Sequence, residues 1–424
     1  MFNRKINEVI GMLLQFRFSN FRCFSEETVF DMTATPIKEH RYSLLQNNGV
    51  NILPVAAIYG ANASGKSSFF MAMERMRAVV VDRLIAQNSP NDRKLKPFSV
   101  PFMFDEKQKK EPTFYEATLL IRDYKYRYGF VCNNDTILSE YLYKQKNSKN
   151  TTVEKLIFKK IKENIEVGNI NKSMKDEIEY CASMSTNKIL LLTEIGLREK
   201  CEELRFVFSW FFGIDIVSNI TQELMLITRN LENFIGDMLT DETLDLEIKE
   251  RYKSLIKEID PSISDIIVTT SVDSDGNTIN KAKTQHVFNG KTADVLFATE
   301  SEGTNKFMFL AIMLLMSIRD GAPIFVDEID SKLHPLVLRK IVQMFTDKET
   351  NPKGAQLIFS AHNIIILDSS DLRRDEIWFV EKENHISTMY SLVDFEDEDG
   401  GIRSDLNYGK HYLNGRFGAV PFQD

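Results

Sequence analysis

The sequence predicts an α/β fold: a mixed sheet with a parallel core, an antiparallel β-subdomain beside it, and an inserted helical domain. Three observations lead to this prediction. A glycine-containing octapeptide, residues 60–67, follows a short apolar run. Apolar runs alternate with helical patterns in the last third of the chain, as in parallel sheets closed by right-handed crossovers. Between these parts, residues 147–265 are rich in Lys, Glu and Asn and poor in Gly and Pro.

Composition bounds the class of protein. A chain of 424 residues with 43% hydrophobic and 27% charged residues has room for two or three globular domains. The longest apolar stretch, residues 307–318, is too short to span a membrane, and the first residues lack the pattern of a secretory signal. Four cysteines at positions 23, 132, 181 and 201 lack zinc or disulfide spacing and are typical of reduced thiols. We therefore expect a cytoplasmic protein without a membrane segment.

The N-terminal part, residues 1–146, is predicted to be mostly β outside the octapeptide and the helix after it. Residues 13–24 alternate apolar and polar side chains like a half-buried strand, and residues 28–32 look like its antiparallel partner. Three further strands are predicted, joined by short turns: 114–121, 125–132 and 140–145. This part is the expected N-terminal half of the fold.

The middle part, residues 147–265, is predicted to be a helical insertion. Leu231, Phe234 and Met238 recur at helical spacing, but the repeat is not sustained as a coiled coil requires. A compact lid or short arm therefore fits better than a long rod. The densest basic run of the chain enters this part: Lys144, Lys146, Lys149, Lys155, Lys159, Lys160 and Lys162. A solvated face and a nucleic-acid or effector contact both stay open for it, although the net charge of −8 disfavours a protein that coats nucleic acid.

The C-terminal part, residues 266–424, returns to strands and then alternates with helices. A strand through Val268 and another over residues 283–288 flank a turn at residues 273–277. The later elements follow as a helix, strand, helix, strand and strand: 305–319, 323–326, 335–347, 355–360 and 377–382. This alternation completes the predicted parallel sheet.

The octapeptide has the spacing of a phosphate-binding loop. Gly60 and Gly65 let consecutive N–H groups face one anion, Lys66 reaches the β- and γ-phosphates, and the Ser67 hydroxyl is a ligand for Mg²⁺. The following helix directs its N-terminus at the phosphates. The predicted ATP-binding residues here are Gly60, Ala61, Asn62, Ala63, Ser64, Gly65, Lys66, Ser67 and Ser68.

A second acidic element follows the apolar run 324–326. Asp327 is placed to hold Mg²⁺ together with Ser67, and Glu328 to orient or deprotonate the water that attacks the γ-phosphate. An ordinary strand end with two exposed acids is the alternative. The phosphate-binding loop favours the catalytic interpretation and predicts ATP hydrolysis, with Lys66 and Glu328 as catalytic residues.

Three further segments, in this order, narrow the class. Residues 300–304 resemble the signature motif of ABC-type ATPases, in which a serine and a glycine bind the γ-phosphate held by the opposite subunit; Ser301 and Gly303 match them. Residues 329–335 follow Glu328 as the D-loop does in that superfamily. His362 ends the next strand as the switch histidine does, and the resemblance gives it a contact with the γ-phosphate. Helix capping and an ordinary polar histidine are the simpler alternatives for Ser301 and His362.

Together these motifs resemble those of an AAA-type ATPase of the ABC/SMC-like superfamily, the group that includes RloA, AbiLi and the overcoming-lysogenization-defect ATPases. The resemblance covers residues 13–130 and 260–424, from the opening strand to the tail at 411–421. It implies an ABC-type P-loop head and a homodimer that sandwiches two ATP molecules, with a higher oligomer allowed. It also implies a role in bacterial antiphage defence beside a separately encoded effector such as a nuclease.

Two classes of function follow. The first is a dimeric nucleotide switch that gates an effector; the second is an SMC-like DNA-binding ATPase in DNA maintenance, for which direct nucleic-acid contact is required. An insertion without heptads disfavours the second. A fused nuclease is disfavoured because only 62 residues follow His362, and a transporter subunit because residues 301–304 lack the Ser-Gly-Gly-Gln signature.

Overall fold

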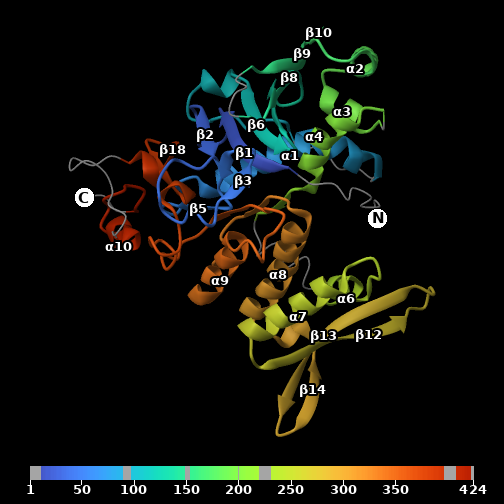
Figure 1. Ribbon diagram of the computed structural model, residues 1–424, viewed down its shortest axis with the longest axis vertical. Helices are drawn as coiled ribbons and strands as arrows, with labels where there is room; N and C mark the ends of the chain where they lie inside the picture. The colour runs from blue at the N-terminus through green and yellow to red at the C-terminus, as the bar shows by residue number, and fades with distance from the viewer. Residues whose placement is uncertain are drawn as a thin grey trace. The chain divides into compact units, whose positions relative to one another are not determined.

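The computed structural model describes residues 11–88, 97–148, 153–198, 200–218, 231–395 and 407–421. The chain divides into two units (Figure 1). The first comprises Met1–Ser218, Ile318–Asp327 and Val342–Asp424, and the second comprises Asn219–Ser317 and Glu328–Ile341. The predicted α/β class is confirmed.

A six-stranded sheet with a parallel core forms the centre of the first unit. Its strands, in spatial order, are β11 (Asp215–Val217), β15 (Ile324–Val326), β16 (Leu357–Ser360), β5 (Val55–Tyr59), β17 (Ile377–Glu383) and β18 (Ile386–Ser391). The first five are parallel, and β18 is antiparallel to β17. Every residue of β5 is buried, as expected for a strand covered on both faces. The carboxyl ends of β15, β16 and β5 therefore meet at one edge of the sheet.

A seven-stranded antiparallel sheet completes the β structure of the first unit. Its spatial order is β10 (Asn164–Val167), β9 (Lys155–Ile161), β8 (Ile137–Lys146), β7 (Tyr124–Cys132), β6 (Thr113–Ile121), β1 (Met12–Ser19) and β2 (Thr28–Asp31). The predicted N-terminal strands are thus confirmed. Phe16 and Phe30 of this sheet pack edge-on against Phe69 of α1 (Lys66–Asn88), with ring centroids 5.9 and 5.0 Å apart. This aromatic contact fixes the helix that follows the octapeptide.

The prediction that residues 147–265 form a helical insertion is wrong over 155–167, where β9 and β10 extend the antiparallel sheet. Residues 156–158 are apolar, and Ile157 and Phe158 are buried in this sheet although lysines flank the run. Three helices follow within the first unit: α2 (Lys172–Met184), α3 (Leu191–Gly196) and α4 (Glu202–Gly213). In α4, Trp210 donates from Nε1 to the carbonyl of Gly11 at 2.7 Å. The division into units thus falls at other residues than the predicted boundaries 146/147 and 265/266.

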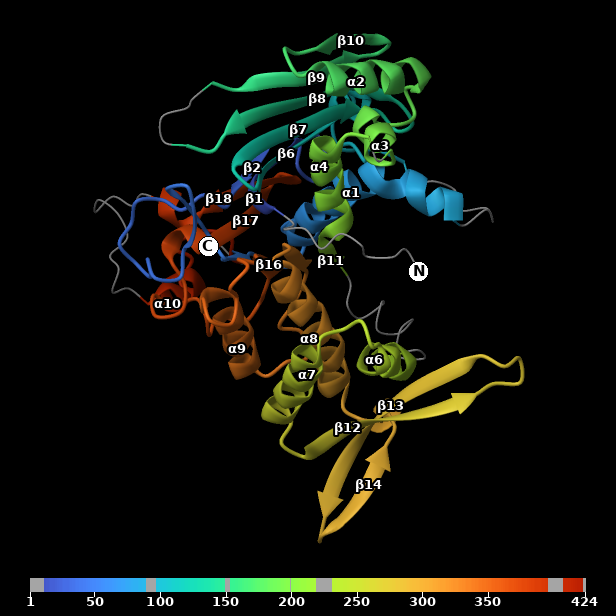
Figure 2. The same cartoon turned by 45° about the vertical axis from the view of Figure 1, so that its right-hand side comes forward.

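The second unit contains helices and a small sheet. Its elements are α6 (Leu231–Thr240), α7 (Leu246–Ile259), β12 (Ile263–Val272), β13 (Thr278–Phe288) and β14 (Lys291–Val295). Figure 2 shows the three strands as antiparallel neighbours, with α6 against β13.

Helices α8 (Glu302–Asp320) and α9 (Pro335–Thr346) both run across the division between the units. The short elements of the first unit are β3 (Leu45–Asn47), β4 (Val50–Ile52), α10 (Tyr408–Leu413) and the 3₁₀ turns η1 (Gln108–Lys110), η3 (Arg374–Glu376) and η4 (Leu392–Asp394); η2 (Phe297–Thr299) lies in the second.

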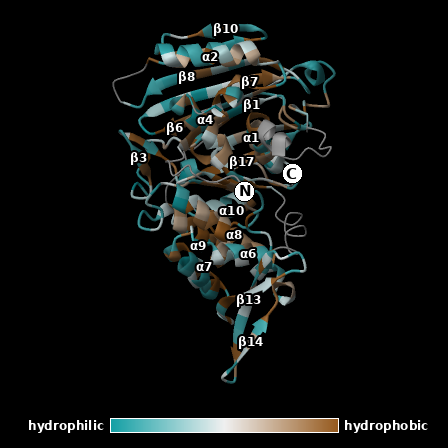
Figure 3. Ribbon diagram, turned by 90° about the vertical axis from the view of Figure 1, so that its right-hand side faces the viewer, coloured by the Kyte–Doolittle hydropathy of each residue, from teal (hydrophilic) through white to brown (hydrophobic). Residues whose placement is uncertain are grey.

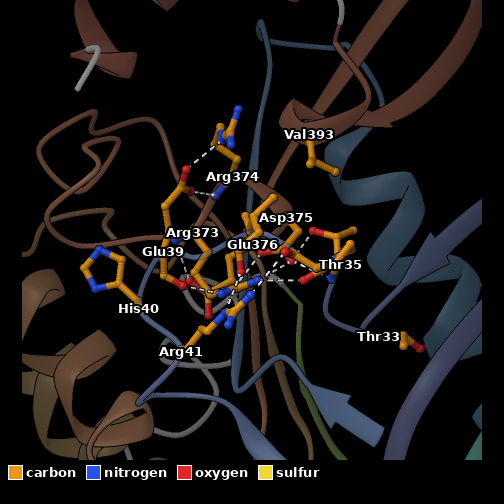
Figure 4. A network of polar contacts seen from close by, with 12 residues as sticks. Thr33, Thr35, Glu39, His40, Arg41, Arg373, Arg374, Asp375, Glu376 and Val393 are labelled. Atoms are coloured by element: carbon orange, nitrogen blue, oxygen red, sulfur yellow. Dashed lines mark hydrogen bonds and ion pairs between the residues drawn. The ribbon is translucent and has the colours of Figure 1, made fainter. Parts of the chain in front are cut away.

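A buried network of charged groups ties the segment after β2 to the start of β17 (Figure 4). Arg373 is fully buried and pairs with Asp375 at 2.7 Å. Thr35 donates to the same carboxylate from its N–H and its hydroxyl, at 2.8 and 2.7 Å. Arg374 donates from Nε to Glu39 at 2.9 Å. Because each buried charge has a partner, the network fixes the chain next to the strand that adjoins β5.

Helix α8 is coloured largely as hydrophobic in Figure 3, and most of its middle is buried. Even so, within the described ranges no helix has the length and apolar character needed to span a membrane. The four cysteines are free thiols, and all four are buried.

Candidate nucleotide-binding site

The octapeptide forms a tight loop between β5 and α1. Gly60, Ala63 and Gly65 have φ of +156°, +63° and +123°. A Cβ at Gly60 would lie 2.3 Å from the carbonyl oxygen of Val380, and a Cβ at Gly65 would lie 2.7 Å from Oγ of Ser387. Only glycine fits these two positions, because the loop packs closely against β17 and β18.

The Lys66 side chain lies inside this loop. Its side chain is buried, and Nζ donates to the carbonyls of Gly60 at 2.7 Å and Ala61 at 3.1 Å. The first turn of α1 begins here, with the N–H groups of Ser68 and Phe69 both donating to the carbonyl of Gly65. A cation at the start of a helix is the arrangement that binds phosphate.

Two residues of the β17–β18 hairpin hold the loop from outside. Ser387 donates from Oγ to the carbonyl of Ser64 at 2.5 Å, and its N–H donates to the carbonyl of Cys23 at 2.8 Å. Lys382 donates from Nζ to the carbonyl of Ala63 at 3.2 Å. These contacts could not be predicted from a local pattern, because they join residues more than 300 positions apart.

Asp327 and Ser360 lie side by side at the carboxyl edge of the sheet. Asp327 is buried and accepts a hydrogen bond from Oγ of Ser360 at 2.5 Å, while its N–H donates to the carbonyl of Val217 at 3.0 Å. Because β15, β16 and β5 are parallel neighbours, this pair and the loop share one sheet edge. Sequence reasoning missed Ser360, although a serine that ends an apolar strand next to Asp327 is a usable signal.

His362 follows β16 by two residues and is exposed. It therefore belongs to the same sheet edge as the loop and Asp327. Its predicted contact with a γ-phosphate stays a prediction.

In the second unit, Ser301 caps helix α8. Its Oγ accepts from the N–H of Thr304 at 3.0 Å, which is the capping role considered above. A Cβ at Gly303 would lie 2.7 Å from the carbonyl oxygen of Lys332, so glycine lets the first turn of α8 approach the segment after Glu328. The ion pair of Lys332 with Glu302 joins the same two segments. The predicted contact of Ser301 and Gly303 with a second subunit's nucleotide stays a prediction.

Glu328 is exposed and has a left-handed backbone, with φ of +51°. Lys306 of α8, a residue that sequence reasoning missed, holds this turn: Nζ donates to the carbonyls of Glu328 at 2.9 Å and Ser331 at 2.8 Å. Burial lowers the pKa of Lys306 to about 8, against the opposing effect of the Asp330 and Glu328 carboxylates. Non-glycine residues in this conformation recur at active sites, where the surrounding structure must hold them. Lys306 could have been found in the sequence as a single lysine in an otherwise apolar helix.

The residues present fit Mg²⁺ with a nucleotide. Magnesium keeps several waters and takes only one or two carboxylates together with phosphate oxygens. Asp327 and the half-buried Ser67 are such a sparse set. Among the described residues, no group of three or more His, Cys, Asp or Glu side chains is placed to hold a metal ion. The site is therefore suited to an ion that arrives with a triphosphate.

The basic run is not a continuous patch in the described part of the chain. Lys144 pairs with Glu203 at 2.5 Å, and Lys160 is buried and donates to Ser185 at 2.5 Å. Lys149 lies outside the described residues. Lys144 is thus paired and Lys160 is buried, so neither adds to an open basic patch.

Comparison with known proteins gives a family match. The family model described as "AAA domain, putative AbiEii toxin, Type IV TA system" matches residues 55–167 and 224–368, more than half of the chain. None of the curated proteins matches the chain.

Several solved structures of Smc heads are similar in fold. The SmcHead bound to the C-winged helix domain of ScpA has 13% identity and a TM-score of 0.44, and the match covers 89% of this chain and 97% of that chain. The head with an extended coiled coil bound to the C-terminal domain of ScpA, derived from Pyrococcus furiosus, has 12% identity, a TM-score of 0.41 and coverage of 90% and 96%. The head with a coiled coil and joint from Pyrococcus yayanosii has 10% identity, a TM-score of 0.41 and coverage of 96% and 100%.

Proposed function

The chain belongs to the family described as "AAA domain, putative AbiEii toxin, Type IV TA system". We therefore propose that it is a Mg²⁺-dependent ATPase that acts as a nucleotide switch. One observation carries the proposal. The glycine loop that confines Lys66 lies at the same sheet edge as Asp327, which Ser360 holds at 2.5 Å. Loop, cation and carboxylate at one edge are the parts that phosphoryl transfer requires.

Each residue has a role in this proposal. Lys66 neutralises the β- and γ-phosphates, and the loop N–H groups orient them. Ser67 and Asp327 hold Mg²⁺, which supplies charge stabilisation at the transferred phosphoryl group. Glu328 orients or deprotonates the attacking water, and His362 senses the γ-phosphate.

We extend the proposal to a dimer that closes over ATP. Ser301 and Gly303 of one subunit complete the site around the nucleotide of the other, and hydrolysis reopens the pair. The resemblance to RloA- and AbiLi-type ATPases, together with the toxin–antitoxin wording of the family description, supports control of a separately encoded effector in defence against phage.

The test measures phosphate release and assembly with the full chain. Lys66→Ala is expected to abolish ATP turnover, whereas Lys172→Ala, an exposed lysine at the start of α2, leaves it unchanged. Glu328→Gln is expected to bind ATP without cleaving it and to elute as a dimer only with ATP. Glu349→Gln, another exposed acid, is the matched control.

Two results would contradict these proposals separately. Turnover in Lys66→Ala equal to that of the unaltered chain refutes the ATPase assignment. An elution volume of Glu328→Gln that ATP does not change refutes the dimer while leaving the hydrolysis intact. The effector is tested by reading the neighbouring genes and co-purifying their products with the chain in both nucleotide states.

A further inference from the structure

An exposed pair of stacked rings includes a residue of the hairpin that contacts the phosphate-binding loop. The Phe104 ring stacks on His385, with centroids 4.4 Å apart and planes inclined by 14°. Phe104 keeps 67% of its surface exposed, and His385 is exposed as well. Phe104 comes from the segment before β6, and His385 from the turn between β17 and β18. A large apolar ring held in water against a second ring suggests a planar ligand.

The hairpin that carries His385 is the one that holds the loop. Lys382, three residues before it, donates to the carbonyl of Ala63, and Ser387, two residues after it, donates to the carbonyl of Ser64. Two residues of extended chain span about 7 Å. The ring of His385 is therefore attached within a short reach of the phosphate-binding loop.

The segment that carries Phe104 is fixed to the same place. Phe102 is buried and donates its N–H to Oδ1 of Asn20 at 2.9 Å, and the N–H of Arg22 donates to the carbonyl of Val100 at 2.7 Å. The turn of Asn20 and Arg22 continues to Cys23, whose carbonyl accepts from Ser387. Both rings are thus anchored, from different parts of the chain, to elements that touch the loop.

His385 lies in a tight hairpin turn with a defined backbone. Asn384 and His385 have φ of +47° and +70°, the left-handed pair that a two-residue hairpin turn requires. Asparagine and histidine are among the non-glycine residues that adopt this conformation most often, so the turn holds the imidazole in a fixed direction without a special backbone. The tight turn alone does not call for an imidazole, whereas a stacking partner for Phe104 does.

We propose that Phe104, backed by His385, is the platform on which the base of the bound nucleotide stacks. The proposal rests on the proposed function, because it adds a base site to a loop that holds the phosphates. A ribose joins the base to the phosphates, which matches a platform attached a few residues from the loop. Arg22 and Lys382, two exposed cations, belong to the segments that anchor the rings and favour an anionic ligand. Stacking on an aromatic ring suits a nucleobase of any identity, so the contact gives affinity rather than selection among bases.

The test compares ATP with inorganic triphosphate, which has the same anionic chain but no base. Binding of each ligand with Mg²⁺ to the full chain is measured by titration calorimetry. Phe104→Ala is expected to weaken ATP binding about tenfold and to leave triphosphate binding unchanged. Phe104→Trp is expected to keep ATP binding and to show fluorescence quenching with ATP and none with triphosphate. Phe288→Ala, which alters another exposed phenylalanine far along the chain on β13, is the matched control.

The outcomes separate this proposal from the one that it rests on. ATP binding that Phe104→Ala does not weaken, or an equal loss for ATP and triphosphate, overturns the base platform alone. Failure of the unaltered chain to bind either ligand overturns the proposed function and the platform with it. Because Phe104 is largely exposed, its replacement leaves the core intact, and an unchanged melting temperature verifies this.

Discussion

Lys306 gives the sharpest quantitative prediction, because two opposing effects on stability meet in one buried side chain. It is 4% exposed and donates to the carbonyls of Glu328 and Ser331. Burial lowers its pKa from 10.5 to about 8. A fall of this size corresponds to about 3 kcal/mol, since one pKa unit is worth 1.36 kcal/mol. Replacement by methionine removes this penalty, but it also removes two charge-assisted hydrogen bonds worth about 1.5–3 kcal/mol each.

The pH dependence of the unfolding free energy separates the effect of the Lys306 charge from that of its hydrogen bonds. A lysine whose pKa is lower in the folded protein binds its proton more tightly when unfolded, so protonation favours unfolding. The stability contributed by Lys306 is therefore reduced below pH 8 and recovers as pH rises from about 8 toward 10.5. Between pH 7 and pH 9, the unaltered chain should gain about 1.4 kcal/mol of unfolding free energy relative to Lys306→Met. Other titrating groups are common to both proteins and cancel in the comparison.

The assay is urea unfolding followed by circular dichroism at pH 7 and pH 9, with the full chain. Lys332→Met is the matched control: Lys332 belongs to the same turn, but its side chain is 46% exposed, and its variant should show no comparable pH effect. A stability difference between the unaltered chain and Lys306→Met that is the same at both pH values would refute the reasoning.

Two further predictions concern the first unit. Ser360→Ala leaves a buried oxygen of Asp327 without its 2.5 Å donor, so the unfolding free energy should fall by about 1.5–3 kcal/mol and hydrolysis should need more Mg²⁺; an unaltered urea midpoint would contradict this. Burial raises the pKa of Glu376 from 4.5 to about 8, so the folded chain keeps a proton that the unfolded chain releases, and stability should fall as pH rises through this window. Glu376→Gln should remove about 2 kcal/mol of that dependence between pH 6 and pH 8, measured as the difference in unfolding free energy, and an undiminished slope in the variant would count against it.

The fold could be predicted where burial of a strand gives a recognisable pattern of apolar residues in the sequence. The buried strands of the parallel sheet are short apolar runs, such as residues 324–326, and the alternation of 13–24 marks a strand with one buried face. Strand β9 was mistaken for helix because lysines flank its apolar residues, a pattern shared by exposed helices and one-sided sheets. Strand β11 has only three residues, too few for any period to show.

Those parts of the candidate site that consist of consecutive residues could be predicted from the sequence. The loop at 60–67 and the pair 327–328 have fixed spacings that phosphate and Mg²⁺ impose. Ser387 was not predictable, because it reaches the loop only through the pairing of β17 with β5, and His385 belongs to the same hairpin. No local pattern distinguishes them from other residues of an exposed hairpin.

The strand order has a consequence for how this protein is made. Strand β5, which ends at the loop, pairs with β16 on one side and β17 on the other, and both follow it by about 300 residues. At a synthesis rate of 5–20 residues per second, the ribosome needs about 15–60 s to add them. During that time β5 has neither of its neighbours, and an apolar strand with two open edges is prone to aggregate. The sheet edge that holds the phosphate-binding loop can therefore be completed only after β16 and β17 have been synthesised.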